Sequence, residues 1–184
     1  GYRKALRMMK LAEKFNLPII SFIDTPGAYP GIGAEERGQS QAIADNLFEM
    51  STLNVPIISI VIGEGASGGA LAIGLADRII CLEYSWYSVI SPEGCASILF
   101  GDSSFNKEAA EMLKVNSRDL FDMNIADKII NEPLGGAHNN EHMVYNSVKD
   151  VISSEYKYLK SLSKTKLVDE RIKKYNNIGV FNEE

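Results

Sequence analysis

The sequence contains few cysteine and histidine residues, and this scarcity excludes several kinds of site. It has only Cys81, Cys95, His138 and His142 among 184 residues. The two cysteines lie 14 positions apart and form no CxxC pair, so the usual cysteine–histidine metal site is not expected. We interpret them as buried, inert thiols, which favours a reducing compartment.

Long apolar runs and blocks of positive charge are also missing. No apolar run approaches the ~20 residues that a membrane-spanning helix needs, so no membrane span is expected. The net charge is −5 and no basic block occurs, which argues against nucleic acid or an anionic membrane surface as the main partner. Hydrophobic residues make up 45% of the chain, enough for one sizeable core.

The first residues predict that this sequence is a piece of a longer protein. The chain starts with Gly1 in place of methionine, and a helical pattern of apolar residues begins almost at once. An element that starts this early indicates entry into the middle of an architecture. The apolar residues on one face are Ala5, Leu6, Met8, Met9, Ala12 and Phe15.

A repeat organises the first half of the chain. The segment FNLPII at residues 15–20 recurs 38 residues later as LNVPII at residues 53–58. In each copy an asparagine that tolerates the left-handed conformation ends an amphipathic helix, and a proline prevents its continuation. The aliphatic residues that follow predict a strand buried on both faces.

Each predicted strand runs into a glycine-rich segment. These segments are DTPGAYPG at residues 24–31 and GEGASGGA at residues 63–70, with Gly27 and Gly65 at equivalent places in the repeat. A helix predicted over residues 35–53 connects the two strands, so a right-handed crossover makes them parallel. Both segments should then lie at the edge of the sheet where ligands of open α/β sheets bind.

The second half predicts further strands and helices. The segments ADRII (76–80) and ADKII (126–130) read as short strands entered through Ala-Asp, and another short strand is expected over residues 86–90. Ser91 and Pro92 are typical of a helix start. Helices are expected near residues 107–114 and 117–123, and a long amphipathic helix from Glu141 to about Leu162 precedes a charged tail. That long helix could pack on its own domain or on a partner chain.

The second glycine-rich segment matches a dinucleotide-binding pattern. Gly63, Gly65 and Gly68 have the GxGxxG spacing after a predicted strand, and Glu83 follows at the distance expected of a ribose ligand. A second short strand follows Glu83 directly, however, where a helical crossover would be required. The pattern also leaves the equivalent glycine Gly27 unexplained.

The same segment matches the GxSxG pattern of a hydrolase. Ser67, Asp127 and His138 occur in the chain order of an α/β-hydrolase triad. That fold needs more strands than this sequence predicts, and a serine before two glycines also suits a tight turn without catalysis.

A third interpretation uses the backbone alone. A glycine-rich segment that enters a helix presents N–H groups without partners, and these attract anions and developing oxyanions. Such donors contribute about 3 kcal/mol each to an acyl-transfer or enolate transition state. Gly68 and Gly69 are the candidate donors, and glycine is favoured because a Cβ would hinder close approach of the ligand.

Several long motifs resemble a known family. The residues that carry the resemblance are FIDTPGAYPG (22–31), AEERGQ (34–39), VIGEGASGGALAIG (61–74), YSVISPEGCASIL (87–99) and EPLGGAH (132–138). They resemble the α subunit of bacterial-type acetyl-CoA carboxylase carboxyltransferase, of the crotonase superfamily. The resemblance implies an α/β crotonase fold of repeated ββα units. Residues 1–138 would form an N-terminally truncated carboxyltransferase domain, and residues 139–184 a C-terminal helical extension.

The resemblance also implies an activity and partners. In this family the α subunit works with a zinc-ribbon β subunit in an α2β2 assembly. Together they transfer a carboxyl group from carboxybiotin on biotin carboxyl carrier protein to acetyl-CoA, forming malonyl-CoA for fatty-acid biosynthesis. Biotin carboxylase is the other expected component. No cofactor is expected to be covalently bound to this chain, zinc is expected only on the β subunit, and the location would be the cytoplasm, or the plastid stroma of an alga.

Residue roles follow from the same resemblance. Gly68 and Gly69 would form a backbone oxyanion hole for the ureido oxygen of biotin. Ala66 stands where many relatives carry glycine, a small change that keeps the backbone donors. Two alternatives stay open, a non-catalytic assembly module and a serine hydrolase that uses Ser67. The expected substrate-binding residues are Gly27, Ala28, Tyr29, Gly65, Ala70 and Gly94.

Overall fold

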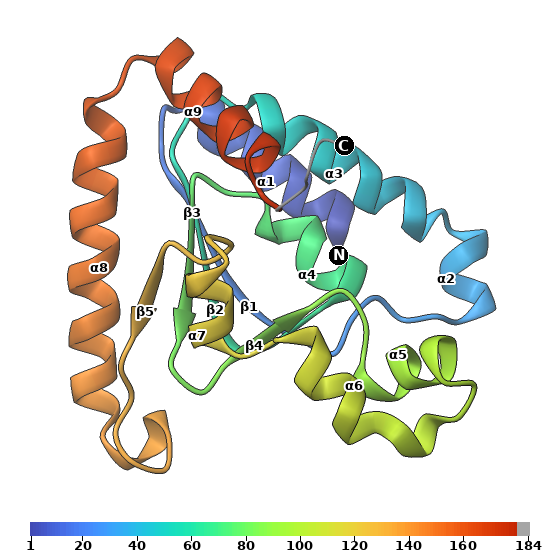
Figure 1. Ribbon diagram of the computed structural model, residues 1–184. Coiled ribbons are helices and arrows are strands. Elements are labelled where there is room, and N and C mark those ends of the chain that lie inside the picture. The colour runs from blue at the N-terminus through green and yellow to red at the C-terminus, as the bar shows by residue number, and fades with distance from the viewer. Residues whose placement is uncertain (180–184) are drawn as a thin grey trace, which may run out of the picture.

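The computed structural model describes residues 1–179, which are built around one five-stranded parallel sheet (Figure 1). Its main path runs in the order β1-β2-β3-β5, and β4 pairs with the far end of β2. The predicted α/β class with parallel strands is therefore confirmed. The strands are β1 (Ile19–Thr25), β2 (Ile57–Ala66), β3 (Arg78–Leu82), β4 (Trp86–Ser88) and β5 (Lys128–Ile130).

The internal repeat is visible in the pairing of β1 with β2. Ile19 lies opposite Ile57 and Ile23 opposite Val61, so each partner is the residue 38 positions later. A register shift follows, and Thr25 pairs with Gly65. The prediction that Gly27 and Gly65 occupy equivalent places is therefore wrong, because extra residues in β2 between Val61 and Gly65 displace the glycines relative to each other.

Residues 57–61 of β2 are buried on both faces, as the aliphatic run predicts. The same prediction is wrong for β1, because Ile20 and Phe22 are exposed on one face. Ile58 and Ile60 belong to a core cluster with α8 (Glu141–Ser161), whereas Ile57 and Val61 belong to clusters on the other face. That second face is covered by α1 (Tyr2–Lys14), α3 (Gln39–Thr52) and α4 (Ser67–Gly74) (Figure 1). The period of two along the strand thus sends alternate residues to opposite layers of helices.

The helix predicted over residues 35–53 is two helices. A short α2 (Ile32–Glu36) ends before Gly38, and α3 follows it. Gly38 has a φ of +70°, in the left-handed region, which no helix interior accommodates. Two other boundaries differ: the strand predicted to reach Ile90 ends at Ser88, and residues 63–66 extend β2 instead of forming a loop.

The predicted helix start at Ser91 is confirmed. The Ser91 Oγ accepts a hydrogen bond from the Gly94 amide at 3.1 Å, and Pro92 is the first residue of α5 (Pro92–Leu99). The structure continues through a 3₁₀ turn (Ser103–Phe105), α6 (Asn106–Leu113) and α7 (Ser117–Asp122). A second 3₁₀ turn (Ala137–Asn139) precedes α8.

The charged tail that the sequence predicts after α8 is a further helix, α9 (Lys164–Asn176). Ser163 caps its start by accepting a hydrogen bond from the Lys166 amide, and Leu167 and Arg171 are buried one turn apart. Val144 and Leu159 of α8 are buried in one core cluster with strand residues, so α8 packs on its own sheet. Within residues 1–179, no helix combines the length and apolar character needed to cross a bilayer.

The two Ala-Asp segments perform the same structural task. The Asp77 carboxylate accepts a hydrogen bond from the Ile57 amide at 2.7 Å, while its own amide donates to the Ile57 carbonyl at 2.9 Å. Asp127 pairs with Ile79 in the same way, at 2.6 and 2.7 Å. Each aspartate therefore joins the start of its strand to the start of the neighbouring strand, and both segments enter short strands as predicted.

Candidate functional site

The candidate site lies where β2 passes into α4 without a loop. Ala66 is extended, with φ −110° and ψ 136°, and Ser67 reverses the chain with a φ of +51°. A left-handed conformation is uncommon for a residue other than glycine. It lets the helix start immediately at the carboxyl edge of the sheet, so the first helical amides lie beside the end of β1.

The first turn of α4 has donors that the helix itself does not use. The amides of Ser67, Gly68 and Gly69 have no helical carbonyl four residues earlier. No side chain of the described residues caps this end of the helix. The site can therefore offer backbone donors, reinforced by the helix dipole, to a developing negative charge.

Gly69 is required by packing. A Cβ at this position would lie 2.6 Å from the Gly27 carbonyl carbon and 2.9 Å from the Ala28 amide nitrogen. Both are backbone atoms, which cannot rotate away. Glycine at position 69 therefore lets α4 lie directly against the peptide that joins Gly27 to Ala28.

Gly68 has a less demanding environment. A Cβ there would lie 3.3 Å from the Ile43 Cδ1 and 4.0 Å from the Ala28 Cβ. The nearer atom is the tip of a flexible side chain that can shift. Packing alone thus gives a weaker reason for glycine at position 68 than at position 69.

The segment after β1 forms the opposite wall of the site. Gly27 has a φ of +128°, and the Thr25 Oγ1 accepts a hydrogen bond from its amide at 3.2 Å. A Cβ on Gly27 would approach the Ala66 carbonyl oxygen and the Ser67 Cβ at 3.7 Å, so the two segments meet here. Tyr29 is 73% exposed. The Asp24 carboxylate accepts a hydrogen bond from the Glu64 amide at 3.0 Å and so braces the two strands.

Three of the predicted substrate-binding residues, Gly65, Ala70 and Gly94, are explained by packing or by hydrogen bonds within the protein. A Cβ on Gly65 would lie 2.6 Å from the Tyr87 ring, so this glycine makes room for Tyr87. Ala70 is fully buried in a core cluster with Ile23. The Gly94 amide already donates to Ser91, so it is not free to bind an anion.

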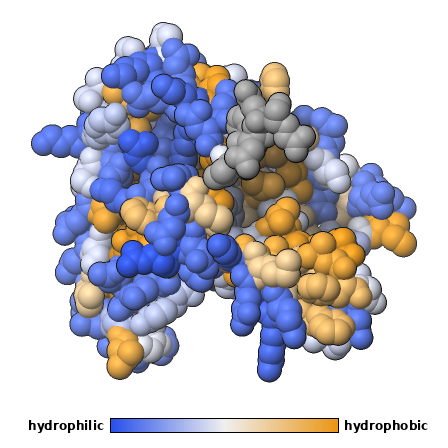
Figure 2. Space-filling view, in the orientation of Figure 1, coloured by the Kyte–Doolittle hydropathy of each residue, from blue (hydrophilic) through white to orange (hydrophobic). Residues whose placement is uncertain are grey.

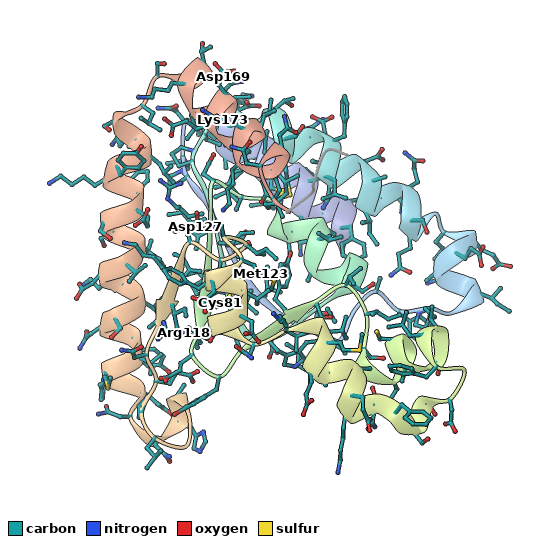
Figure 3. All side chains as sticks on the ribbon, viewed as in Figure 1. Cys81, Arg118, Met123, Asp127, Asp169 and Lys173 are labelled. Carbon is teal, nitrogen blue, oxygen red and sulfur yellow. The ribbon has the colours of Figure 1, made fainter. Side chains whose placement is uncertain are left out.

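A cavity of about 360 Å³ opens next to Ser67. Burial raises the pKa of the Tyr87 side chain in its wall to about 12, so that hydroxyl stays protonated at neutral pH. Figure 3 labels Met123, another wall residue, just after α7. Sequence reasoning missed this wall, although Leu113 and Leu120 lie in segments that it predicts as helices. The remaining lining residues are Leu71, Ser88, Val89 and Ile125.

Apolar side chains are exposed on the neighbouring segments. Val89 is 71% and Ile98 73% exposed, and Leu99, Phe100 and Phe105 are exposed as well. Figure 2 shows apolar side chains gathered on this side of the molecule, over α5 and α6. A patch of this kind is typical of a surface that binds another protein.

The hydrolase triad is not assembled. Asp127 lies at the start of β5, where Lys174 of α9 and the Ile79 amide donate to its carboxylate (Figure 3). Ser67 lies at the opposite edge of the sheet, after the carboxyl end of β2. The Glu83 carboxylate, the acid of the dinucleotide pattern, accepts a hydrogen bond from the Glu132 amide at 2.9 Å, and β4 follows β3 where that pattern needs a helical crossover. Among residues 1–179, no three His, Cys, Asp or Glu side chains gather as a metal site would require.

The sheet topology and the strand-to-helix junction define a crotonase-fold protein. Transcarboxylase 12S aligns with a TM-score of 0.69 and 19% identity, over 100% of this chain and 32% of that one. A Pseudomonas malonate decarboxylase hetero-tetramer in complex with malonate aligns with a TM-score of 0.74 and 15% identity, over 94% of this chain and 68% of that one. At such low identity these likenesses establish the fold.

The chain belongs to the acetyl co-enzyme A carboxylase carboxyltransferase-like family, whose model matches residues 1–179. Acetyl-coenzyme A carboxylase carboxyl transferase subunit alpha of Chlorobium phaeobacteroides is 56% identical over 184 residues. The protein of the same name from Vesicomyosocius okutanii is 61% identical over 181 residues, which are 98% of this chain. The chain spans 55% and 56% of the lengths of these relatives, or about half.

Proposed function

We propose that this chain supplies the biotin side of a carboxyltransferase active site, which transfers a carboxyl group from carboxybiotin to acetyl-CoA and forms malonyl-CoA for fatty-acid biosynthesis. Membership of the family supports this proposal. The structural observation that carries it is the junction at Ser67, which leaves the amides of Gly68 and Gly69 without helical partners beside the segment at Gly27.

Backbone donors are the groups that this reaction needs from the chain. Cleavage of the N–CO2 bond of carboxybiotin leaves the electron pair on the ureido group, with negative charge on its oxygen. The Gly68 and Gly69 amides donate to that oxygen and stabilise it by about 3 kcal/mol each. The biotin nitrogen then takes a proton from the acetyl-CoA methyl group, and the resulting enolate carbon attacks CO2. No side-chain base is required.

In this proposal some of the other predicted residues line the biotin pocket, and the rest act indirectly. Gly27, Ala28 and Tyr29 line the biotin pocket opposite the donors. Gly65 acts indirectly, through the space that it leaves for Tyr87. Ala70 is buried, and the Gly94 amide already donates to Ser91, so we assign both residues a supporting role behind the site.

The proposed partners follow from the family. A zinc-carrying β subunit completes the active site in an α2β2 assembly, biotin carboxyl carrier protein delivers carboxybiotin, and biotin carboxylase recharges it. The exposed apolar patch over α5 and α6 supports a partner chain at this side. The proposed compartment is the cytoplasm, or the plastid stroma if the source is an alga.

A pair of substitutions at position 68 tests the donor role. Gly68→Pro removes the N–H in the first turn of α4 and also constrains the left-handed Ser67 before it, whereas Gly68→Ala adds a Cβ but keeps the N–H. In the complex with the β subunit, the kcat for carboxyl transfer should fall about 10²–10³-fold for the proline variant and much less for the alanine variant. Circular dichroism and thermal unfolding establish that both variants are folded.

The outcome separates the proposal from its alternatives. Equal activity of the two variants would refute the donor role of Gly68. An unchanged kcat in both variants would favour a chain that serves assembly only. Labelling of Ser67 by a fluorophosphonate probe on the folded protein would favour the hydrolase.

A further inference from the structure

Buried and half-buried polar side chains from three elements meet the carboxyl end of α4. The Asn46 Nδ2 of α3 donates to the Ala72 carbonyl at 2.8 Å, and the Ser21 Oγ of β1 donates to the Ile73 carbonyl at 2.8 Å. The Ser59 Oγ of β2 lies 2.8 Å from the Ser21 Oγ and 3.2 Å from the Ile73 carbonyl oxygen. We call Ser21, Asn46 and Ser59 the α4 anchor.

The two hydroxyl groups can share their protons in two ways, and the shorter contacts favour one of them. Each serine has a single O–H to donate. If Ser21 donates to the Ile73 carbonyl, Ser59 can donate to Ser21, and both contacts of 2.8 Å are satisfied. The anchor is then a chain of donors that starts in β2, passes through β1 and ends on the helix.

Helix α4 depends on such bonds because it has neither a glycine cap at its carboxyl end nor large buried side chains that would fix its position. Its last carbonyls have no helical partners, and the chain leaves through Leu75 in an extended conformation instead of a glycine cap. Its buried residues are Gly69, Ala70, Ala72 and Gly74. Small side chains permit close packing but interlock weakly, so they resist sliding along the helix axis less than large ones would.

The two ends of α4 are rigidly connected. The helix has eight residues, so with a rise of ~1.5 Å per residue its first amide lies only about 10 Å from its last. A translation of Ala72 and Ile73 along the helix axis is therefore transmitted to Gly68 and Gly69. At that end the place for a Cβ on Gly69 is only 2.6 Å from the Gly27 carbonyl carbon, so displacement in one direction is blocked.

We propose that the α4 anchor is a positioning device for the backbone donors of the site. Ser21, Asn46 and Ser59 hold the carboxyl end of the helix, the Gly27 peptide limits its other end, and the Gly68 and Gly69 amides are thereby fixed in place. These three side chains touch no reacting atom. This inference rests on the proposed function for its catalytic consequence, but the positional part stands on the contacts alone.

The environment of Asn46 supports this role. It is fully buried, and its Oδ1 is the one buried side-chain oxygen or nitrogen of the described residues without a hydrogen-bond partner. An unsatisfied buried acceptor is a cost that leucine at the same position would avoid. The hydrogen bond from the Nδ2 to the Ala72 carbonyl is what offsets that cost. The contact with α4 therefore accounts for an asparagine at this buried position.

The test compares anchor variants with a matched control in the complex with the β subunit. Ser21→Ala removes the shorter hydroxyl contact with the Ile73 carbonyl, and Asn46→Leu removes the donor to Ala72. Ser21→Thr retains the hydroxyl, and Ser85→Ala removes a buried serine that donates to the Leu82 carbonyl. We expect kcat to fall about 10- to 10²-fold in the two anchor variants, with little change in KM. Ser21→Thr and Ser85→Ala should stay close to the wild type.

Amide NMR shifts and hydrogen exchange of Gly68 and Gly69 provide a readout that does not depend on activity. They should change in Ser21→Ala and Asn46→Leu and stay unchanged in Ser85→Ala. Unchanged glycine amides in the anchor variants would overturn the inference, as would an equal loss of kcat in Ser85→Ala. If the glycine amides shift while Gly68→Pro retains full activity, the positioning stands and the proposed function fails. Ser21→Ala carries the test if Asn46→Leu does not fold.

Discussion

Arg171 in α9 holds Asp77 at the start of β3 through two hydrogen bonds, of 2.8 Å to Oδ1 and 2.9 Å to Oδ2. The remaining N–H groups of the guanidinium donate to the carbonyls of Met50, Leu53 and Val55, at 2.8 to 3.0 Å. All five donors of this buried side chain are thus paired. The last helix is thereby joined to the end of α3 and to the segment that enters β2.

Arg171→Ala should destabilise the protein by about 3–5 kcal/mol, because Asp77 would remain buried without its charge partner. Urea unfolding monitored by circular dichroism measures this loss. Lys166→Ala is the control, since Lys166 makes an exposed pair with Glu170 at 3.7 Å and its loss should cost under about 1 kcal/mol. Similar losses in both variants would show that Arg171 does not anchor α9.

Gly69→Ala should destabilise the protein more than Gly68→Ala does. The new Cβ at position 69 would meet backbone atoms of Gly27 and Ala28, whereas the one at position 68 meets only the tip of Ile43. Overpacking of this kind costs about 1–3 kcal/mol. Thermal unfolding of the two variants gives the comparison, and a smaller loss for Gly69→Ala would contradict the packing described for α4.

Stability should fall in acid as Glu155 becomes protonated. Burial raises the pKa of this carboxyl, but hydrogen bonds from Lys128 and Arg78 outweigh burial and lower it below the ordinary value of 4.5. Its contribution is therefore fully present above pH 4.5 and is lost as the pH falls through the lower folded value. Glu155→Gln should lower stability at neutral pH and approach the wild type in acid.

Urea unfolding at several pH values measures this difference. Glu170→Gln serves as the control, because its partner Lys166 is 61% exposed and the pair is screened by solvent. A gap between the wild type and Glu155→Gln that stays constant down to strongly acidic pH would contradict the role of the carboxylate.

Cys81 should resist alkylation in the folded protein. Burial raises the pKa of its thiol to about 11, although a hydrogen bond with Ser85 partly opposes the shift. Little reactive thiolate is then present at pH 8, and the side chain is fully buried. Iodoacetamide followed by mass spectrometry should label position 81 only after urea unfolds the protein. Rapid labelling of the native chain would show that β3 opens locally.

Much of the sheet could be predicted because its signals are local and repeated. The recurrence of Asn-x-Pro before an aliphatic run fixes two strands, and the 38-residue interval reappears as the offset between Ile19 and Ile57. The Ala-Asp segments and the Ser91 cap are likewise short patterns with one structural use each. The break at Gly38 was missed since an isolated glycine inside a helical pattern is often tolerated.

What could not be predicted depends on contacts between distant segments. The partners of Arg171 are 94 to 121 residues away, and in the sequence this residue is one of several charges in a polar tail. The demand for glycine at position 69 likewise arises only when α4 meets the segment at Gly27. Sequence motifs identified the edge of the sheet that carries the candidate site, but they could not separate glycines needed for packing from those proposed as donors.

The bonds of Arg171 also have a consequence for the order of folding during synthesis. Chains emerge from the ribosome with the N-terminal part first, and their domains fold as units. The carbonyls of Met50, Leu53 and Val55 are made more than 110 residues before the guanidinium that satisfies them. Until translation reaches α9, the start of β2 must leave these groups to water. The first half of the chain thus acquires its final stability only when the last helix has been synthesised.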